Sequence, residues 1–337
     1  MITYTKVIDP NDIDLKFIQD AADVIRSGGL VAFPTETVYG LGANALDPKA
    51  VSKIFEAKRR PLDDPLIVHI NDAADLEKLT KDIPEKAYEL ARVFWPGPLT
   101  LILSKKDIVP DITTCGLDTV AIRMPSGSIA RELIKISGVP IAAPSANLFG
   151  RPSSTNAHHV KNDLEGYIDM ILDGGKTLIG VESTVIEMVD SKAVILRPGG
   201  IDIEEIRKVI KDVKVFSEQE VLQNSPGKYP QHYSPKAKVI ISRESASQKK
   251  TTLELAGKFK AKGLNVGIMA KSGRQKEYAG YNVKEMGSEN DLKEIAANLF
   301  HILREFDTDG VQLIIAEAVK EPGLGLAIMN RLRKAAG

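Results

Sequence analysis

The segment Lys58-Arg59-Arg60-Pro61 places three cations side by side, before a proline-stiffened stretch that runs to Pro65. Lysine supplies a point charge and arginine a planar fork that can hold two oxygens, so Lys58 and Arg60 suit the phosphates of a ligand. The segment is expected at the end of a helix, where free carbonyls also favour cations, so a purely structural role stays open. If the pair clamps phosphate, both side chains should face the ligand rather than the core.

A second polar segment, PTETVYGLG, spans residues 34–42 and follows a short apolar run that is typical of a buried strand. It carries the hydroxyls of Thr35 and Thr37, the carboxylate of Glu36 and two glycines, and loops at strand ends are where α/β sheets build sites. The alternative is a tight turn whose glycines serve geometry alone. The glycine spacing is not a dinucleotide fingerprint, and no Walker A motif occurs in the chain.

A third segment, Ala143-Pro144-Ser145-Ala146-Asn147, comes directly after a predicted strand. Ser145 and Asn147 stand two residues apart, so in an extended chain their side chains would lie on the same side. A hydroxyl and an amide together suit a phosphate or a metal-bound water. An ST-turn or Asx-turn that merely starts a loop explains the same residues equally well.

Single polar residues stand at the ends of other predicted strands, namely His69, Arg123, Ser183 and Arg197. Such residues are common in sites and on plain surfaces, and a lone strand histidine is more often a hydrogen-bonded core residue than a catalyst. The pair His158-His159 does not predict a metal site, because adjacent side chains point apart and no third ligand is suitably spaced. Neither a Ser-His-Asp triad nor a glycosidase carboxylate pair is indicated.

The composition is that of a folded globular protein of about two domains. The 337 residues carry 45 Lys plus Arg and 45 Asp plus Glu, so the net charge is zero and gives no reason to expect unspecific nucleic-acid binding. One cysteine, Cys115, excludes an internal disulfide and a structural zinc. No signal peptide and no apolar run of membrane-spanning length is visible, so we expect a cytoplasmic protein without membrane contact.

Apolar periodicity predicts the elements that must hold the polar segments. Helical spacing or helix-starting residues indicate helices over residues 14–27, 47–58, 84–94, 128–136 and 201–210, and short apolar runs indicate strands over 30–33, 65–70, 99–103, 119–124, 140–143, 168–172, 183–188 and 193–196. Farther along, strands over 237–241, 264–270 and 310–316 alternate with helices over 251–260, 292–306 and 326–334. This alternation predicts a small parallel sheet.

The prediction is therefore an α/β protein with a sheet-rich catalytic domain over residues 1–215 and a smaller domain over 237–337. Between them, residues 216–236 contain several prolines and little periodicity, so we expect a linker there.

The order of the motifs resembles the YrdC family of threonylcarbamoyl-adenylate synthases. The resemblance rests on PTETVYGLG, on Lys58-x-Arg60, on Ser145-x-Asn147 and on GVESTVIE at residues 180–187, and it covers about residues 28–200. The stretches SPGKYPQHYSP at 225–235 and GLGLAIMNRLRKAA at 323–336 are similar to the linker and the C-terminal end of the long, two-domain form. The resemblance implies an open, strongly twisted YrdC-like α/β sheet, followed by a smaller Rossmann-like domain.

The resemblance also implies a reaction. L-Threonine and bicarbonate form a carbamate, whose oxygen attacks the α-phosphate of ATP, and pyrophosphate leaves. The product would be L-threonylcarbamoyladenylate, which a downstream tRNA threonylcarbamoyl-transferase complex uses to modify the adenosine next to the anticodon. Mg²⁺ would be bound mainly through the ATP phosphates, so no metal-binding residue is assigned. Weak direct binding of tRNA or other RNA stays open.

The resemblance assigns roles to single residues. Lys58, Arg60, Ser145 and Asn147 would be catalytic, with the two cations stabilising the charge on the leaving pyrophosphate. The residues near L-threonine would be Thr35, Thr37, His69, Arg123, Ala143 and Ser183. The residues that contact ATP would be Lys58, Arg60, Asp64, Thr119, Ser145, Asn147, Ser153, Arg197, His232 and Tyr233. The last two would reach back from the linker and cover the nucleotide; Asp64 stands where the family often has asparagine.

Two other functions remain as alternatives. An RNA-binding module would use a basic concave surface, but the balanced charge and the scarcity of aromatic residues disfavour it. A carbamoyl-transfer enzyme of hydrogenase maturation carries zinc fingers around its YrdC domain, which a chain with one cysteine cannot form. For the synthase we expect a preference for threonine over serine without exclusivity, because one methyl group is worth only about 1–3 kcal/mol in a pocket.

Overall fold

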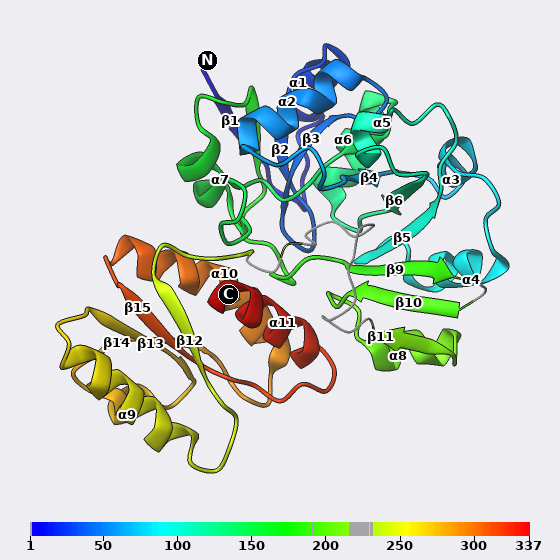
Figure 1. The fold of residues 1–337 in the computed structure, drawn as a ribbon. Coiled ribbons are helices and arrows are strands. Elements are labelled where there is room, and N and C mark those ends of the chain that lie inside the picture. The colour runs from blue at the N-terminus through cyan, green and yellow to red at the C-terminus, as the bar shows by residue number, and fades with distance from the viewer. Residues whose placement is uncertain (1, 190–191, 216–228, 230–231) are drawn as a thin grey trace. The chain divides into compact units, whose positions relative to one another are not determined.

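The computed structural model describes residues 2–189, 192–215, 229 and 232–337. The described residues form two compact units, each with its own sheet (Figure 1). The first contains residues 2–149, 153–178, 182–189 and 192–215; the second contains 150–152, 179–181, 229 and 232–337. The predicted linker lies largely outside the described residues, so the boundaries 1–215, 216–236 and 237–337 stay predictions.

The first unit is built on an 11-stranded mixed sheet, in the order β1-β8-β2-β3-β7-β4-β6-β5-β9-β10-β11. Its strands are β1 (Tyr4–Val7), β2 (Val31–Pro34), β3 (Tyr39–Asn44), β4 (Ile67–His69), β5 (Leu99–Ser104), β6 (Thr119–Arg123), β7 (Ile141–Ala142), β8 (Met170–Asp173), β9 (Thr184–Val189), β10 (Lys192–Arg197) and β11 (Val213–Val215). Its helices are α1 (Leu15–Arg26), α2 (Pro48–Lys58), α3 (Asp75–Leu79), α4 (Glu85–Phe94), α5 (Asp111–Thr114), α6 (Ser128–Ser137), α7 (Ala157–Leu164) and α8 (Ile203–Val209).

Local sequence signals explain several helix ends. The Asp47 side chain caps α2 by accepting a hydrogen bond from the backbone of Lys49, and Pro48 occupies the first turn, where no hydrogen-bond donor is required. Gly138 ends α6 in the left-handed conformation that glycine adopts without strain. These helix positions agree with the prediction from the sequence.

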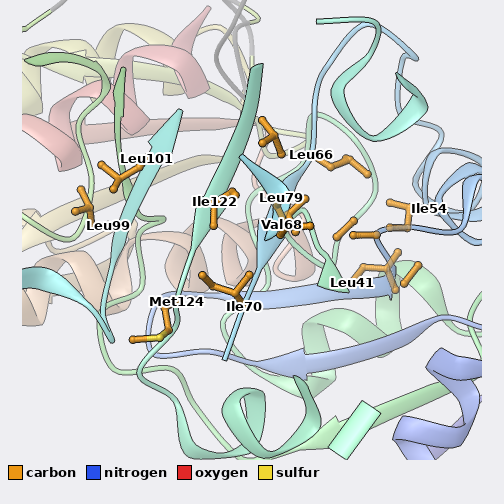
Figure 2. Close-up of a cluster of buried hydrophobic side chains, with 14 of the residues drawn as sticks. Leu41, Ile54, Leu66, Val68, Ile70, Leu79, Leu99, Leu101, Ile122 and Met124 are labelled. Atoms are coloured by element: carbon orange, nitrogen blue, oxygen red, sulfur yellow. The ribbon is translucent and has the colours of Figure 1, made fainter. Parts of the chain in front are cut away.

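The main core of the first unit lies between helices and one face of its sheet. Leu41, Ile54, Val68, Leu101 and Ile122 belong to this cluster of buried side chains (Figure 2). Alternate residues of the same strands point to the opposite face, as the pleat requires. There a smaller cluster contains Ile67, Ile102, Ala121 and Val185.

The second unit has a four-stranded sheet in the order β12-β15-β13-β14, with every strand pair parallel. Its strands are β12 (Lys238–Ser242), β13 (Val266–Lys271), β14 (Asn282–Gly287) and β15 (Leu313–Glu317), and its helices are α9 (Gln248–Lys260), α10 (Leu292–Thr308) and α11 (Gly325–Ala336). A short 3-10 helix, η1 (Gln275–Tyr278), joins β13 to β14. The predicted α/β class and the predicted parallel second sheet are confirmed.

One prediction about the first unit is wrong. The segment 34–42 is a loop only over its first half, because residues from Tyr39 onward form β3, antiparallel to β2. A Cβ atom on Gly42 would lie 2.7 Å from the Phe33 ring and 2.8 Å from Ile141, closer than side chains pack. Gly42 therefore allows close packing within the sheet and does not form a binding loop.

Candidate active site

The candidate residues of the central strands share the face that carries the smaller apolar cluster. His69 stands two residues after Ile67 on β4, and Arg123 stands two residues after Ala121 on β6. Side chains two residues apart on a strand point to the same face. His69 is paired in register with Arg123, which is in turn paired with Thr100 on β5. Since the other face is filled by the main core, this face is the one on which the strands can present polar groups to a ligand.

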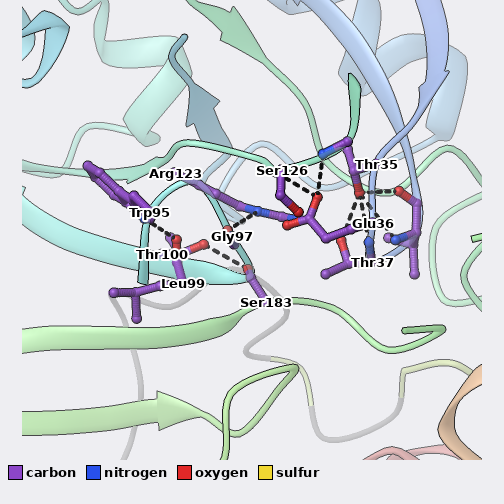
Figure 3. A network of polar contacts seen from close by, with 12 residues as sticks. Thr35, Glu36, Thr37, Trp95, Gly97, Leu99, Thr100, Arg123, Ser126 and Ser183 are labelled. Carbon is purple, nitrogen blue, oxygen red and sulfur yellow. Dashed lines mark hydrogen bonds and ion pairs between the residues drawn. The ribbon is translucent and has the colours of Figure 1, made fainter. Parts of the chain in front are cut away.

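An ion pair fixes Arg123 at the end of β6. Its Nη2 donates to Glu36 Oε1 at 2.7 Å, and its Nε donates to the carbonyl of Gly97 at 3.4 Å (Figure 3). Both side chains are buried. The second oxygen of Glu36 accepts hydrogen bonds from the backbone of Ser126 and Gly127. Of the five N–H donors of a guanidinium, these contacts within the described residues use two, which leaves donors for a carboxylate.

His69 stays neutral beside this arginine. Burial, together with the charge of Arg123, lowers the pKa of His69 to about 3, although the backbones of Ile67 and Ile141 oppose part of the shift. Among the described residues, its buried Nδ1 has no hydrogen-bond partner. A neutral imidazole with a buried, unused nitrogen is suited to a polar contact with a small ligand.

The loop between β2 and β3 presents two buried hydroxyls. Thr35 Oγ1 lies 2.8 Å from Thr37 Oγ1 and donates to the carbonyl of Val38 at 2.7 Å. It also accepts from the backbone nitrogens of Thr37 and Val38. The hydroxyls are therefore held in place by the loop itself, and the intervening Glu36 reaches Arg123 (Figure 3).

A second polar chain links the strands on the other side of Arg123. Thr100 Oγ1 and Ser183 Oγ are 2.7 Å apart, and Arg197 Nη2 donates to Ser183 Oγ at 3.1 Å. Arg197 also donates to the backbone carbonyl of Ser183. All three side chains are buried, so the predicted threonine contact Ser183 and the predicted ATP contact Arg197 are joined directly.

Lys58 and Arg60 are buried, contrary to the expectation that both side chains face a ligand. Lys58 Nζ donates to the carbonyls of Ser145 and Asn147, so it brings the two predicted catalytic motifs together. Arg60 Nη2 lies 2.9 Å from Asp64 Oδ2, and the guanidinium donates to the carbonyls of Asp64 and Pro65. Lysine and arginine side chains are usually exposed, so their burial could not be expected from the sequence.

The expectation that Ser145 and Asn147 point the same way from an extended chain is also wrong. The backbone nitrogen of Asn147 donates to the carbonyl of Ser145 at 3.0 Å, so the chain bends tightly after an isolated bridge between Gly40 and Ser145. Ser145 is half-buried and Asn147 is buried. The segment is therefore a turn closed by the backbone, not an extended strand.

The remaining candidates are spread more widely. Ala143 donates its backbone N–H to Ile67, and Ser153 Oγ donates to Glu182. Thr119 begins β6, roughly 13 Å along the strand from Arg123 at about 3.3 Å per residue.

The two candidates from the predicted linker, His232 and Tyr233, belong to the second unit, where Tyr233 packs on Phe300. That they cover a nucleotide stays a prediction.

Two residues of the network, Glu36 and Thr100, were not among the candidate site residues. Glu36 stood between the two threonines already singled out, but its partner Arg123 is 87 residues away and could not be assigned from the sequence. Thr100 is a polar residue within the apolar strand LTLILS, and this interruption is the signal that could have found it.

Among the described residues, no group of three or more His, Cys, Asp or Glu side chains is arranged to hold a metal ion. Nor does any helix in the part of the chain that the structure describes combine the length and apolar character needed to cross a membrane.

Comparison with known proteins identifies the class. A family model described as "Telomere recombination", for the Sua5, YciO and YrdC proteins, matches residues 23–199. A second model, described as "Threonylcarbamoyl-AMP synthase, C-terminal domain", matches residues 201–337. The chain belongs to the threonylcarbamoyl-AMP synthase family, in its two-domain form, and the family and ATP-using enzyme class predicted from the sequence are confirmed.

Relatives match nearly the whole chain. The threonylcarbamoyl-AMP synthase of Pyrococcus abyssi is 52% identical over 325 residues, covering 95% of this chain and 94% of the relative. The threonylcarbamoyl-AMP synthase of Bacillus subtilis is 50% identical, covering 95% and 93%. The crystal structure of P. abyssi Sua5 complexed with L-threonine has a TM-score of 0.94 at 50% identity and covers 100% of this chain and 98% of that one. The predicted fold, a YrdC-like sheet domain with a smaller α/β domain, is thereby confirmed.

Proposed function

We propose that this chain condenses L-threonine, bicarbonate and ATP to L-threonylcarbamoyladenylate, pyrophosphate and water. The observation that carries the proposal is the arrangement around Arg123, whose buried guanidinium keeps unused donors beside the neutral His69. The carboxylate of threonine would take those donors. The hydroxyls of Thr35, Thr37 and Ser183, together with Ala143, would complete the threonine site.

The nucleotide half of the site would use the second set of residues. Lys58 and Arg60 are held rigidly by buried partners, so they would offer fixed positive charge where negative charge builds on the departing pyrophosphate. Ser145 and Asn147 form the turn whose carbonyls bind Lys58. Ser153, Thr119, Asp64 and Arg197 would contact other parts of ATP. His232 and Tyr233 would cover the nucleotide and keep out the water that destroys the product.

The reaction would proceed in two steps. The amine of threonine and bicarbonate would first give the carbamate and water. A carbamate oxygen would then attack the α-phosphorus, forming the P–O bond as the bond to the pyrophosphate breaks. The bridge from Ser183 to Arg197 would place the threonine end of the carbamate next to the nucleotide.

Mg²⁺ would be bound chiefly by the ATP phosphates and water, as this ion commonly is with nucleotides. We also propose that the unstable product passes to a downstream tRNA threonylcarbamoyl-transferase complex. A direct weak contact with tRNA is a separate question, which a gel-shift titration at several salt concentrations would answer.

The test is an omission experiment that measures pyrophosphate release from ATP and Mg²⁺. We expect release only when threonine and bicarbonate are both present. Release that needs neither would mean a plain ATPase or pyrophosphohydrolase. If the folded protein releases no pyrophosphate, the RNA-binding alternative would be favoured instead.

A further inference from the structure

The second unit carries a polar cluster that the proposed reaction does not use. Strand β13 ends at Lys271 and the parallel neighbouring strand β15 ends at Glu317, so both residues lie at the carboxyl edge of this sheet. Open parallel sheets bind their ligands outside this edge. Arg274, which directly precedes η1, adds a second cation three residues beyond Lys271.

Glu317 is the fixed centre of the cluster. Its buried carboxylate accepts hydrogen bonds from the backbone of Lys271 at 2.8 Å, from Arg274 Nη1 at 2.6 Å and from the hydroxyl of Tyr278. Gln248 Oε1 accepts from the same Nη1 at 3.2 Å. Nη1 of Arg274 is therefore fixed by Glu317 and Gln248, whereas Nη2 takes part in neither of these contacts.

The free arm of Arg274 and the ammonium of Lys271 share one distant partner. Lys271 Nζ is 3.6 Å from Glu289 Oε2, and Arg274 Nη2 is 3.7 Å from the same oxygen. Hydrogen bonds between such charged groups are about 2.7–2.9 Å long, so Glu289 lies too far from either cation to form one. The Lys271 side chain is only 5% exposed, whereas that of Glu289 is 59% exposed.

This arrangement compensates the charge of Lys271 only weakly. The stem of the side chain is buried, and the nearest carboxylate is an exposed one beyond hydrogen-bond length. Glu317 is the buried carboxylate beside the two cations, and the exposed Glu285 accepts hydrogen bonds from the backbone of Gly273 and Gln275 on either side of Arg274.

We propose that Lys271 and Arg274 form a binding site for a phosphate group, and that Glu289 is a displaceable carboxylate which occupies the site when no phosphate is bound. A tetrahedral phosphate presents more oxygens than a carboxylate and reaches both cations at hydrogen-bond length. The lysine provides a point charge and the free arginine arm a directed donor. The phosphate comes either from an inorganic ion or from a nucleotide.

Calorimetric titration of the full chain distinguishes these sources, with inorganic phosphate, pyrophosphate and AMP as separate probes. The active site of the first unit is unchanged in every variant below, so a difference between variants reports the second unit. Lys271→Met keeps the aliphatic stem and removes the charge, and we expect it to abolish one binding event that the unaltered protein shows. Glu289→Gln removes the competing charge, and we expect it to tighten the same event severalfold.

The matched control is Lys249→Met, which breaks a half-exposed ion pair with Glu277 in the same unit and should leave binding unchanged. The probe that binds most tightly at the Lys271-dependent event identifies the source of the phosphate. Superimposable titrations of the unaltered, Lys271→Met and Glu289→Gln proteins with all three probes would overturn the proposal. If Lys271→Met does not fold, Glu289→Gln decides, since unchanged or weaker binding there also contradicts it.

Discussion

Both units of the molecule hold an arginine against a buried carboxylate at strand ends, and each carboxylate accepts hydrogen bonds from three donors. In the second unit, Glu317 accepts from Arg274, from Tyr278 and from the backbone of Lys271. In the first unit, Glu36 fixes Arg123 but leaves part of its guanidinium unoccupied. Beside it, His69 has a buried nitrogen without a partner among the described residues.

The difference lies in the group beside the arginine, which is a neutral imidazole in the first unit and the Lys271 ammonium in the second. Buried polar groups are normally hydrogen-bonded, because an unmet donor or acceptor costs about 1–3 kcal/mol. A site that keeps such groups unpaired sacrifices stability that a ligand restores on binding. The first unit does this at Arg123 and His69, beside the satisfied Glu36, and the second at Lys271 and Arg274, beside the satisfied Glu317.

The largest expected effect comes from Lys58→Met. The change removes a buried positive charge and the donor to the carbonyls of Ser145 and Asn147. We expect pyrophosphate release to fall by about 100-fold or more, with a loss of about 1–3 kcal/mol in the free energy of unfolding. The control is Lys53→Met on the same helix, whose exposed side chain donates to Gly28 and which should keep full turnover. Equal losses in both variants would remove the special role of Lys58.

Arg123→Met should separate stability from function. The change leaves the buried Glu36 carboxylate without its ionic partner, and such a loss costs about 3–5 kcal/mol of unfolding free energy. Adding Glu36→Gln neutralises that carboxylate and should recover much of the stability in urea unfolding, while threonine-dependent turnover stays lost. If the double variant regains turnover along with stability, Arg123 does not bind substrate.

His69 predicts a pH dependence of stability. Its pKa is about 3 in the folded protein and about 6.5 when unfolded, so between these values the unfolded chain binds the extra proton. The contribution to stability is complete above about pH 6.5 and is lost as the pH falls toward 3, with a slope of up to about 1.4 kcal/mol per pH unit. Denaturant unfolding of His69→Asn across this range should show a shallower slope than the unaltered protein. Parallel slopes would contradict the neutral, buried histidine.

The smallest effect should come from Tyr278→Phe in the network around Glu317. Burial raises the pKa of Tyr278, which keeps its hydroxyl protonated as a donor to Glu317. Removing one of three donors should cost about 1–2 kcal/mol of unfolding free energy. Pyrophosphate release at saturating substrate should not change, and a drop in turnover without a drop in stability would break the contrast between the two networks.

The local signals in the sequence were sufficient for much of the fold. Asp47 with Pro48 and the glycine at 138 bounded their helices correctly, because capping depends on neighbouring residues alone. Strand β3 was missed, since glycines at 40 and 42 argue against a strand unless a close neighbour such as Phe33 is known. The alternation of elements correctly predicted the second, parallel sheet.

The sequence predicted which residues belong to the candidate site better than it predicted how they are arranged. Motif order brought Lys58, Ser145 and Asn147 into one prediction, and the structure joins them through the Lys58 ammonium. Their burial could not be predicted, because the carbonyls that hold Lys58 lie 87 and 89 residues away. The same applies to the Glu36–Arg123 ion pair, which only the folded sheet brings together.

The polar network around Arg123 is proposed to bind the threonine that becomes carbamoylated. The most direct measurement supplies ¹³C-labelled bicarbonate, ATP, Mg²⁺ and L-threonine and follows labelled threonylcarbamoyladenylate by mass spectrometry. It compares the unaltered protein with the Arg123→Met/Glu36→Gln variant. We predict labelled product from the unaltered protein and almost none from the folded double variant. Equal yields from both would contradict this assignment, because the threonine site would then lie elsewhere.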